Sequence, residues 1–268
     1  MLIHEIDFAE MYRKHMRGSD RPHKPASAWD ERAKALSGKV MQSDYTKQFL
    51  ARMDLSGAST LLDIGCGPGT IGVPLASGLD AVYGLDYSPA MLECMRENAQ
   101  AAGVNNVHPL LLSWTDDWAD VPVCDIVVAS RSSIVPDMAE ALGKMTSHAR
   151  LRCYMTHLVG GHFGDACIAE LLGRQRQSFP DYIYIINLLY GMGVHPRLDY
   201  LAFPSRLAGT ANAEEFVQRV EWSFGELEKD QKEKLRAWYA EDPVRAAQGG
   251  EPMRWAMVSW DAGQPGAC

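Results

Sequence analysis

Apolar residues in the first 160 positions form short runs, each bounded by glycine, proline or polar turn residues. Runs of this length, rich in aliphatic residues, predict strands. The predicted strands lie near 60–64, 81–86, 107–112, 124–130 and 151–158. Apolar positions at helical spacing between them predict helices over about 69–78, 89–102 and 137–146. This alternation is typical of a doubly wound α/β fold, in which the carboxyl ends of the strands meet at one edge.

The pattern changes after the fifth strand. A long, aromatic-rich helical stretch occupies about 161–195, and two more strand-like runs follow at 198–203 and 253–260. Helical patterns at about 211–223 and 226–240 separate these two runs. The chain therefore predicts a seven-stranded, mainly parallel sheet with a helical insertion after the fifth strand.

Composition narrows the class of partner. The chain has 268 residues, of which 47% are hydrophobic, and this is ordinary for one globular α/β protein. A formal net charge of −8 and a pI near 5.5 argue against a broad nucleic-acid-binding surface and favour a small molecule or a protein as substrate. The sequence leaves the oligomeric state open.

Cysteine spacing and the amino-terminal region indicate the compartment. Six cysteines are scattered without a C-x-x-C pair or a Cys/His ligand spacing, so we expect reduced thiols, no disulfide framework and no metal site. The amino-terminal region lacks the order of a signal peptide, and the longest apolar run, 182–192, is too short to span a bilayer. We therefore expect a cytoplasmic protein that does not bind membranes.

The most informative stretch joins the first predicted strand to the first helix: Leu61-Leu62-Asp63-Ile64-Gly65-Cys66-Gly67-Pro68-Gly69-Thr70. Three glycines at alternate positions permit positive φ angles and let a ligand approach the backbone without meeting a Cβ atom. The spacing differs from the dinucleotide motif G-x-G-x-x-G, because the third glycine comes one residue early and an acid stands two positions before the first. Taken alone, the triplet also fits a simple turn.

A second acid ends the second predicted strand. Asp86 follows Gly65 by about 20 residues, where a βαβ unit places the carboxylate that binds a ribose diol. A carboxylate accepts hydrogen bonds only, so it suits both hydroxyl protons of a diol. Ser88 before Pro89 indicates a helix that begins with an N-cap serine and a first-turn proline. Without the glycine motif, Asp86 would fit a solvated acid at a strand end.

The glycine motif and the D-x-S-x-x-M pattern at 86–91 together resemble the cofactor site of class I (Rossmann-like) S-adenosylmethionine-dependent methyltransferases. The resemblance implies that Asp63 interacts with the methionine moiety and that the glycine loop packs under the amino acid and the ribose. It also implies that the last strand inserts antiparallel beside the sixth. The cofactor-binding residues that it implies in this region are Asp63, Gly65, Cys66, Gly67, Gly69, Asp86, Tyr87 and Met91.

The end of the third strand is expected to complete the adenine site. The family usually carries an acid there, which accepts a hydrogen bond from the adenine amino group, whereas this chain has Ser113. Asp116 or Asp117 substitutes if the turn is short. Trp114 either stacks on the adenine or packs with Trp118 as a core aromatic. The predicted contacts are Ser113, Trp114 and Thr115.

Hydroxyl groups and a guanidinium follow the fourth strand. In the family this strand end lies beside the sulfonium and the transferable methyl group. Ser130 is therefore predicted to contact the cofactor, and Arg131 is predicted to be a catalytic residue that holds a substrate carboxylate or phosphate. The alternative is an ion pair between Arg131 and an acid such as Asp137, which would only fix the loop.

The amino-terminal segment 1–55 is predicted to be a helical lid on a cofactor-binding domain at 56–268. Ser27-Ala28-Trp29-Asp30-Glu31-Arg32-Ala33 resembles the W-D-x-R-A entry helix of small-molecule methyltransferases. Asp30 and Arg32 would then anchor the lid when it closes. We expect the basic run upstream, which includes Arg13 and Lys24, to be solvated and mobile.

The insertion at about 161–195 is predicted to determine specificity. His157, at the end of the fifth strand, or His162 is a candidate for taking a proton from the nucleophile, and His157 is the predicted base. Tyr184 and Tyr190 would line the acceptor site. In the alternative view the histidines are structural and the tyrosines pack in the core.

These features predict an enzyme that transfers a methyl group from S-adenosylmethionine to an unidentified small molecule. The reaction would be a direct displacement, with catalysis mainly by positioning. The Asn-Pro-Pro-Tyr motif of nucleobase methyltransferases is absent from the sequence, which makes a nucleic-acid substrate less favoured. Two alternatives remain: a non-catalytic sensor or assembly protein that binds S-adenosylmethionine or S-adenosylhomocysteine, and an NAD-dependent dehydrogenase.

Overall fold

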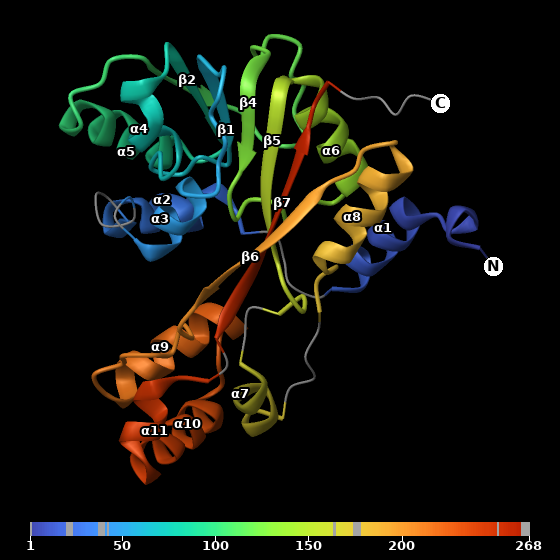
Figure 1. Cartoon of the computed structure of the whole chain (residues 1–268). Coiled ribbons are helices and arrows are strands. Elements are labelled where there is room, and N and C mark those ends of the chain that lie inside the picture. The colour runs from blue at the N-terminus through green and yellow to red at the C-terminus, as the bar shows by residue number, and fades with distance from the viewer. Residues whose placement is uncertain are drawn as a thin grey trace.

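A computed structural model describes residues 2–19, 24–36, 41, 43–162, 165–173, 178–250 and 252–263. Within them, seven strands form one sheet in the order β3-β2-β1-β4-β5-β7-β6 (Figure 1). The strands are β1 (Thr60–Ile64), β2 (Ala81–Asp86), β3 (Val107–Leu111), β4 (Cys124–Ala129), β5 (Ala149–Leu158), β6 (Arg197–Phe203) and β7 (Met253–Asp261). β7 lies between β5 and β6 and is antiparallel to both, whereas the pairs among β1 to β5 are parallel. The predicted seven-stranded, mainly parallel sheet is confirmed.

The sheet is buried on both faces, which is why its strands read as nearly continuous apolar runs. On β4, Ile126 and Val128 pack into the core of one face, and Val127 and Ala129 pack into the core of the other. The first face is covered by α3 (Asp44–Leu50), α4 (Gly72–Leu75) and α5 (Pro89–Ala101). The second face is covered by α1 (Phe8–Gly18), α6 (Met138–Ser147) and α8 (Tyr182–Gly191).

Capping residues set where several helices begin. The Ser88 side chain accepts from the backbone N–H of Met91 and Pro89 is the first residue of α5, as the sequence predicted. Asp137 caps α6 in the same way. The helix predicted over 69–78 is shorter, because α4 ends at Leu75 and a 3₁₀ turn, Ala76–Gly78, follows it. Gly72 and Pro74 within this stretch are poor helix formers.

The stretch 161–195 divides into two short helices that go to different places. α8 joins the sheet face, where the Tyr184 ring packs edge-on against Tyr12 with 5.7 Å between the ring centroids. α7 (Ala166–Leu171) instead joins three helices from the β6–β7 connection, around a separate apolar core that includes Ile168 and Phe216. These three are α9 (Ala213–Phe224), α10 (Lys229–Glu241) and α11 (Pro243–Gln248).

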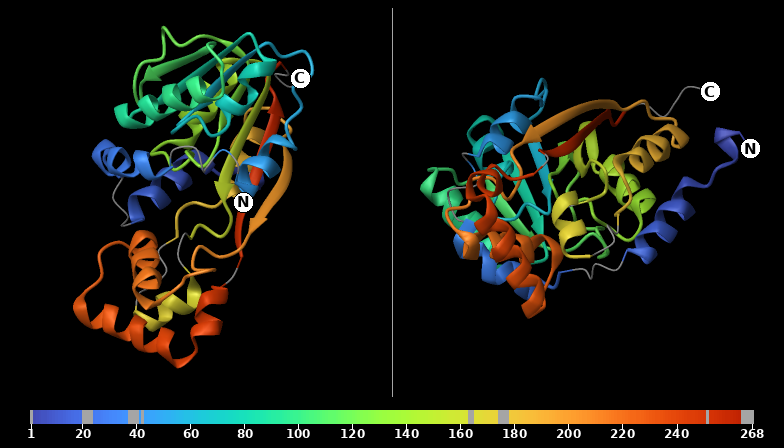
Figure 2. Two further views of the ribbon diagram at one scale, coloured as in Figure 1. Left: turned by 90° about the vertical axis from the view of Figure 1, so that its left-hand side faces the viewer. Right: turned by 90° about the horizontal axis from the view of Figure 1, so that it is seen from below.

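We call α7, α9, α10 and α11 the helical lobe. It lies beyond the carboxyl ends of the parallel strands, below the sheet in Figure 1 and in the left view of Figure 2. The aromatic helix that was expected to cover this edge, α8, lies on a face of the sheet instead. The larger insertion at the ligand-binding edge is therefore the one between β6 and β7.

The amino-terminal helices α1, α2 and α3 occupy separate positions, and α3 lies on the first face of the sheet. A 3₁₀ turn, Ile3–Glu5, precedes α1, whose Tyr12 is fully buried and donates a hydrogen bond of 2.9 Å to the carbonyl of Val135. The expectation of a solvated, mobile basic run is therefore wrong for α1, where Arg13 also pairs with Asp137 at 3.0 Å. The second helix, α2 (Ala26–Leu36), packs on α5 near the carboxyl edge of the sheet. No helix among the described residues is long and apolar enough to cross a membrane.

Candidate active site

The glycine loop after β1 has the backbone that the sequence motif requires. Gly65, Gly67 and Gly69 have φ angles of 63°, 54° and 82°. A Cβ atom added at Gly65 would lie 2.3 Å from the Cβ atom of Ser132, so this glycine is required by packing within the protein. The space beside Gly67 is different, because the nearest atom to an added Cβ is the sulfur of Met91 at 3.9 Å. The loop thus leaves a cradle at Gly67 that a ligand can fill.

Asp63, two residues before Gly65, carries a buried carboxylate oxygen without a hydrogen-bond partner among the described residues. Its Oδ2 accepts from the backbone N–H of Gly72 at 3.1 Å, whereas its Oδ1 has no hydrogen-bond partner among the described residues although it is buried. Burial raises the pKa of this carboxyl group to about 7. A buried acceptor without a partner costs free energy, which a cationic ligand group would recover.

Asp86 is the last residue of β2, and its carboxylate links the end of β2 to the glycine loop after β1. Its Oδ2 accepts from the N–H of Gly67 and its Oδ1 accepts from the N–H of Ser88, both at 2.9 Å. Burial raises the pKa of Asp86. Each carboxylate oxygen has two lone pairs, so the group can hold the loop and still accept from a diol.

Cys66 and Met91, both predicted to contact the cofactor, are buried. The Cys66 sulfur lies 3.6 Å from the Met95 sulfur in the core, and burial raises the pKa of its thiol well above the usual value. Met91 packs against Ala33 of α2 and lies below the cradle at Gly67. Met91 can therefore support the floor of the site, whereas the side chain of Cys66 contributes to the core.

Helix α2 is held at the edge of this site by polar contacts. Asp30 accepts hydrogen bonds from the Ser88 hydroxyl at 2.6 Å and from the Ala90 N–H at 3.2 Å. The hydroxyl of Tyr87 donates to the carbonyl of Lys24 at 3.1 Å. These contacts place α2 beside Asp86, where it can cover a bound adenosine.

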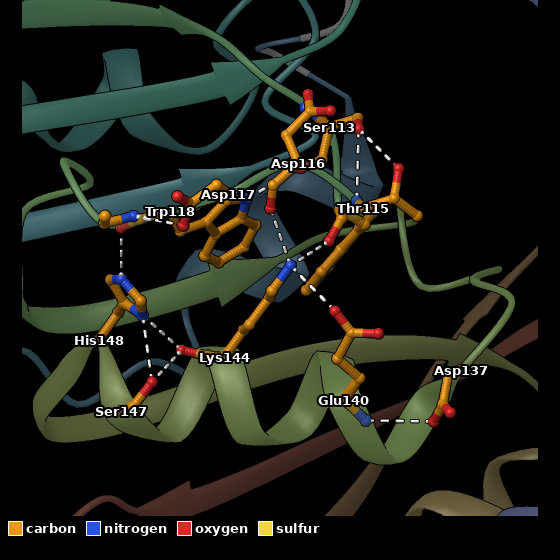
Figure 3. Close-up of polar contacts among 12 residues, drawn as sticks. Ser113, Thr115, Asp116, Asp117, Trp118, Asp137, Glu140, Lys144, Ser147 and His148 are labelled. Atoms are coloured by element: carbon orange, nitrogen blue, oxygen red, sulfur yellow. Dashed lines mark hydrogen bonds and ion pairs between the residues drawn. The ribbon is translucent and has the colours of Figure 1, made fainter.

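The turn after β3 is fixed by its own side chains and by Lys144 of α6 (Figure 3). The N–H of Ser113 donates to the Asp116 carboxylate at 2.7 Å. The Ser113 hydroxyl lies 3.1 Å from that of Thr115. The Lys144 ammonium donates to the carbonyls of Trp114 and Asp116 at 2.7 and 3.0 Å and pairs with Glu140. The turn is therefore rigid, and its contact with the adenine stays a prediction.

Trp114 has a packing role within the protein. Its ring stacks on that of Trp118, with 5.5 Å between centroids, and its Nε1 donates to the carbonyl of Ser132 at 2.8 Å. Ser132 in turn donates to the carbonyl of Ile64 at 2.6 Å. Trp114 thus links the turn after β3 to the loop after β4 and the glycine loop, as the packing alternative expects.

The loop after β4 is arranged around Tyr45, which the sequence analysis missed. The Tyr45 hydroxyl lies 2.8 Å from the Ser130 hydroxyl and 2.7 Å from the Thr156 hydroxyl. The Arg131 guanidinium stands over the Tyr45 ring, 4.0 Å from its centroid. Arg131 has a φ of 58° and donates its N–H to Thr156 at 2.9 Å. The acid named as its alternative partner, Asp137, pairs with Arg13 instead.

His157 lies in the core and does not face the site. It is fully buried, its Nε2 lies 2.8 Å from the carbonyl of Pro180, and its Nδ1 lies 2.8 Å from the hydroxyl of Ser133. A carbonyl only accepts, so Nε2 carries the proton. Burial lowers the pKa of the ring. The predicted role of His157 as a base that contacts the acceptor does not fit this position, and the structural alternative does.

The tyrosines predicted to line the acceptor are also elsewhere. Tyr184 packs on α1, Tyr182 shares a hydrogen bond of 2.7 Å with Tyr200 of β6, and Tyr190 is exposed. All three come from α8 on the face of the sheet. The structure instead forms a cavity of about 670 Å³ between the ends of β5 and β7 and the helical lobe. Its lining includes Leu158, His162, Arg206, Ser223 and Arg254.

Comparison with known proteins decides what this arrangement is. A family model described as a methyltransferase domain matches residues 55–159. The fold is similar to a methyltransferase of Thiobacillus denitrificans in complex with S-adenosylhomocysteine (TM-score 0.53, 15% identity, 89% of this chain and 99% of that chain). It is also similar to one of Geobacter sulfurreducens with the same ligand (TM-score 0.55, 14% identity, 88% and 98%). The chain contains a methyltransferase domain, and its fold is that of the class I S-adenosylmethionine-dependent methyltransferases.

Two relatives match this chain in sequence. An uncharacterized protein of Haemophilus influenzae is 35% identical to this methyltransferase over 268 residues, which cover 97% of this chain and 98% of that one. The trans-aconitate 2-methyltransferase of Rhodococcus jostii is 31% identical over 142 residues, which cover 50% of this chain and 53% of that one.

The residues of the site fit S-adenosylmethionine, the cofactor of the family. The unpartnered Oδ1 of Asp63 matches a positively charged group, and the cradle at Gly67 admits a ligand against the backbone. Asp86 stands where a diol acceptor is required, and α2 lies beside it. The residues that fit the cofactor thus lie at the ends of β1 and β2, whereas the cavity lies beyond the ends of β5 and β7.

Proposed function

We propose that this methyltransferase transfers the methyl group to a small molecule bound in the cavity between the sheet and the helical lobe. The cavity carries the proposal, because its volume of about 670 Å³ falls within the usual range for small-molecule sites. Its lining mixes apolar residues such as Leu158 and Phe224 with polar ones such as Ser205 and Arg254.

Each part of the site has a role in this reaction. When bound, S-adenosylmethionine supplies a methyl group on a positively charged sulfur. Asp63 would hold the ammonium of the methionine moiety, Asp86 would accept from the ribose, and the Gly67 backbone would lie against the ligand. Tyr45, with Arg131 stacked on its ring, hydrogen-bonds to Thr156 of β5 and would separate this half of the site from the ends of β5 and β7. The helical lobe would cover the bound acceptor.

Catalysis is proposed to come from positioning. An acceptor lone pair forms a bond to the methyl carbon as the carbon–sulfur bond breaks, its electron pair stays on sulfur, and any proton of the acceptor leaves to water. Alignment of two bound reactants can supply several kcal/mol of a barrier. No protein base is assigned to the acceptor, since His157 is buried and uses both ring nitrogens.

The first test measures which ligand the glycine loop binds. Calorimetry should detect S-adenosylmethionine and S-adenosylhomocysteine but not NAD. Asp86→Ala should weaken S-adenosylhomocysteine about tenfold or more, because it removes a charged acceptor. Asp80→Ala is the matched control, since Asp80 is an exposed acid at the opposite end of β2. Binding of NAD alone, or equal affinity in both variants, would contradict the assignment.

A second experiment separates an enzyme from a sensor. Labelled methyl donor should transfer its methyl group to a member of a metabolite set, and trans-aconitate belongs in that set because a relative is named for it. A sensor would bind the donor without any transfer. The proposal also places the enzyme in the cytoplasm. It is supported by buried cysteines that form no disulfide within the described residues, Cys66, Cys124 and Cys153, because reduced thiols suit a reducing compartment.

A further inference from the structure

Two guanidinium groups at the carboxyl edge lack acidic partners. Neither Arg32 nor Arg131 donates a side-chain hydrogen bond or forms an ion pair within the part of the chain that the structure describes. Each stacks on an aromatic ring instead: the Arg32 Cζ lies 3.7 Å from the ring centroid of Trp222, and the Arg131 Cζ lies 4.0 Å from that of Tyr45. Stacking stabilises a cation but leaves its N–H donors unused.

The absence of acids here is a local feature. The protein has 34 acidic residues against 26 basic ones, so carboxylates are plentiful. Among the described residues elsewhere, the arginines that pair with carboxylates include Arg13, Arg17, Arg52, Arg96, Arg150, Arg152, Arg197, Arg219 and Arg236. Burial and the positive charge of Arg131 both lower the pKa of Arg32. An anion beside the two guanidiniums would offset this repulsion between like charges.

The backbone holds Arg131 in a strained position. Its φ of 58° lies in the left-handed region, which is unfavourable for a residue with a side chain. The hydrogen bond from its N–H to Thr156 and the contacts of the next residue, Ser132, with Ile64 and Gly65 maintain this conformation. Such strain concentrates at ligand-binding positions.

The pair lies on the acceptor side of the site. Tyr45, which Arg131 covers, contacts Thr156 of β5, Phe203 of β6 and Trp255 of β7, away from Asp86 on β2. Trp222, which Arg32 covers, immediately precedes Ser223 of the cavity lining. Trp255 likewise follows the cavity residue Arg254 in β7. Trp222 and Trp255 are therefore each adjacent in sequence to a residue of the cavity lining.

Resting on the proposed function, we propose that Arg32 and Arg131 together bind one anionic group, a carboxylate or a phosphate, of the methyl acceptor. The planar forks of two guanidiniums match the oxygens of either group. The two arginines come from different elements, α2 and the loop after β4. A bound anion would therefore also draw α2 and, through Trp222, the helical lobe against the edge of the sheet.

The test titrates anions into the full chain. S-adenosylhomocysteine is titrated first. Citrate and inorganic phosphate are then titrated separately into the protein saturated with S-adenosylhomocysteine, at constant ionic strength. At least one anion should bind with one-to-one stoichiometry. Arg32→Gln and Arg131→Gln should each weaken that binding about tenfold or more. Arg245→Gln is the matched control, since Arg245 also stacks on a ring, that of Trp238, but in α11.

The outcomes separate this inference from the proposed function. Loss of anion binding in both variants, with S-adenosylhomocysteine affinity and thermal midpoint unchanged, supports it. Equal weakening of S-adenosylhomocysteine would assign the guanidiniums to the carboxylate of the cofactor and overturn the inference. Absence of anion binding in the unaltered protein, or equal binding in all variants, would also overturn it. Failure of S-adenosylhomocysteine itself to bind would instead contradict the proposed function.

Discussion

Ser132 lies directly against Gly65, so that a Cβ atom at Gly65 would come within 2.3 Å of the Cβ atom of Ser132. The loop after β4 thereby closes over the loop after β1, and the Ser132 hydroxyl fastens it by donating to the carbonyl of Ile64 at 2.6 Å. Two glycines of one motif consequently serve different purposes. Gly65 admits a neighbouring loop, whereas Gly67, with open space beside it, admits the ligand.

The two positions should respond differently to substitution. Gly65→Ala should lower the free energy of unfolding by about 2 kcal/mol or more, because strain at positive φ adds to a collision with Ser132. Gly67→Ala should lower it by about 1 kcal/mol, from strain alone, and weaken S-adenosylhomocysteine more than tenfold. Urea denaturation and calorimetry measure the two quantities. Equal destabilisation by both variants would contradict the distinction.

Cofactor binding should depend on the ionisation of Asp63. Burial raises its pKa to about 7, so the carboxyl is largely protonated at pH 6, and a cationic ligand group favours the ionised form. S-adenosylhomocysteine affinity should therefore rise as pH increases from 6 to 8, with release of a proton on binding. Calorimetry in buffers of different ionisation enthalpy measures that proton, and Asp63→Asn should abolish its release.

The contribution of Asp63 to the stability of the cofactor-free protein should fall as pH rises, whereas its contribution to cofactor binding should rise. The folded-state pKa of Asp63 lies above that of an unfolded aspartate, so the folded protein binds the extra proton. This contribution is fully present below about pH 4 and is lost as pH rises through about 7. Comparison of the unaltered protein with Asp63→Asn by urea denaturation between pH 5 and 8 isolates it. A parallel pH dependence in both would exclude this role.

His157 should be important for stability and unimportant for cofactor binding. His157→Phe leaves the Pro180 carbonyl without its donor, at a cost of about 1–3 kcal/mol, whereas the Ser133 hydroxyl keeps the carbonyl of Thr156 as its acceptor. Because burial lowers the pKa of His157, its contribution to stability is present above about pH 6.5 and is lost as pH falls. Denaturation at pH 5.5 and 7.5 tests both statements. An unchanged stability with a large loss of methyl transfer would restore the role of a base.

Ligands should protect α2 and the helical lobe from hydrogen exchange. Asp30 and Tyr87 hold α2 beside Asp86, so S-adenosylhomocysteine should slow exchange in α2 and in the glycine loop. An acceptor, once found, should slow exchange in α9 as well. The aromatic helix α8 should change little, because it packs on a face of the sheet. Protection centred on α8 would favour the original assignment of specificity to 161–195.

The sheet was predictable because strands buried on both faces consist of nearly continuous apolar runs. Residues 124–130 were predicted as the fourth strand and Cys124–Ala129 form it, since four successive residues, Ile126 to Ala129, point alternately into two cores. The glycine motif could also be recognised from the sequence, because positive φ restricts the residue type at three positions. Local constraints of this kind need no knowledge of distant contacts.

The half of the site that would bind the methyl acceptor was not predictable in the same way. Tyr45 reaches Ser130 and Thr156 across 85 and 111 positions of sequence, and nothing near Tyr45 indicates those partners. The strand pattern around His157 does not tell whether its ring enters the core or the site. The division of 161–195 did have a signal, since Pro180 followed by the N-cap Asp181 separates α8 from what precedes it.

Phe203 and Met253 are paired residues at adjoining ends of β6 and β7, and the whole segment between them leaves and re-enters the sheet there. Neighbouring antiparallel strands place such ends about 5 Å apart, so the segment is inserted through a gap no wider than a hairpin. Its replacement by a segment of another length would disturb neither the strand order nor the glycine loop, which follows β1 and is separated from β6 by β4, β5 and β7. This architecture allows the choice of acceptor to diverge in evolution, by exchange of a module, while the means of binding the methyl donor is inherited unchanged.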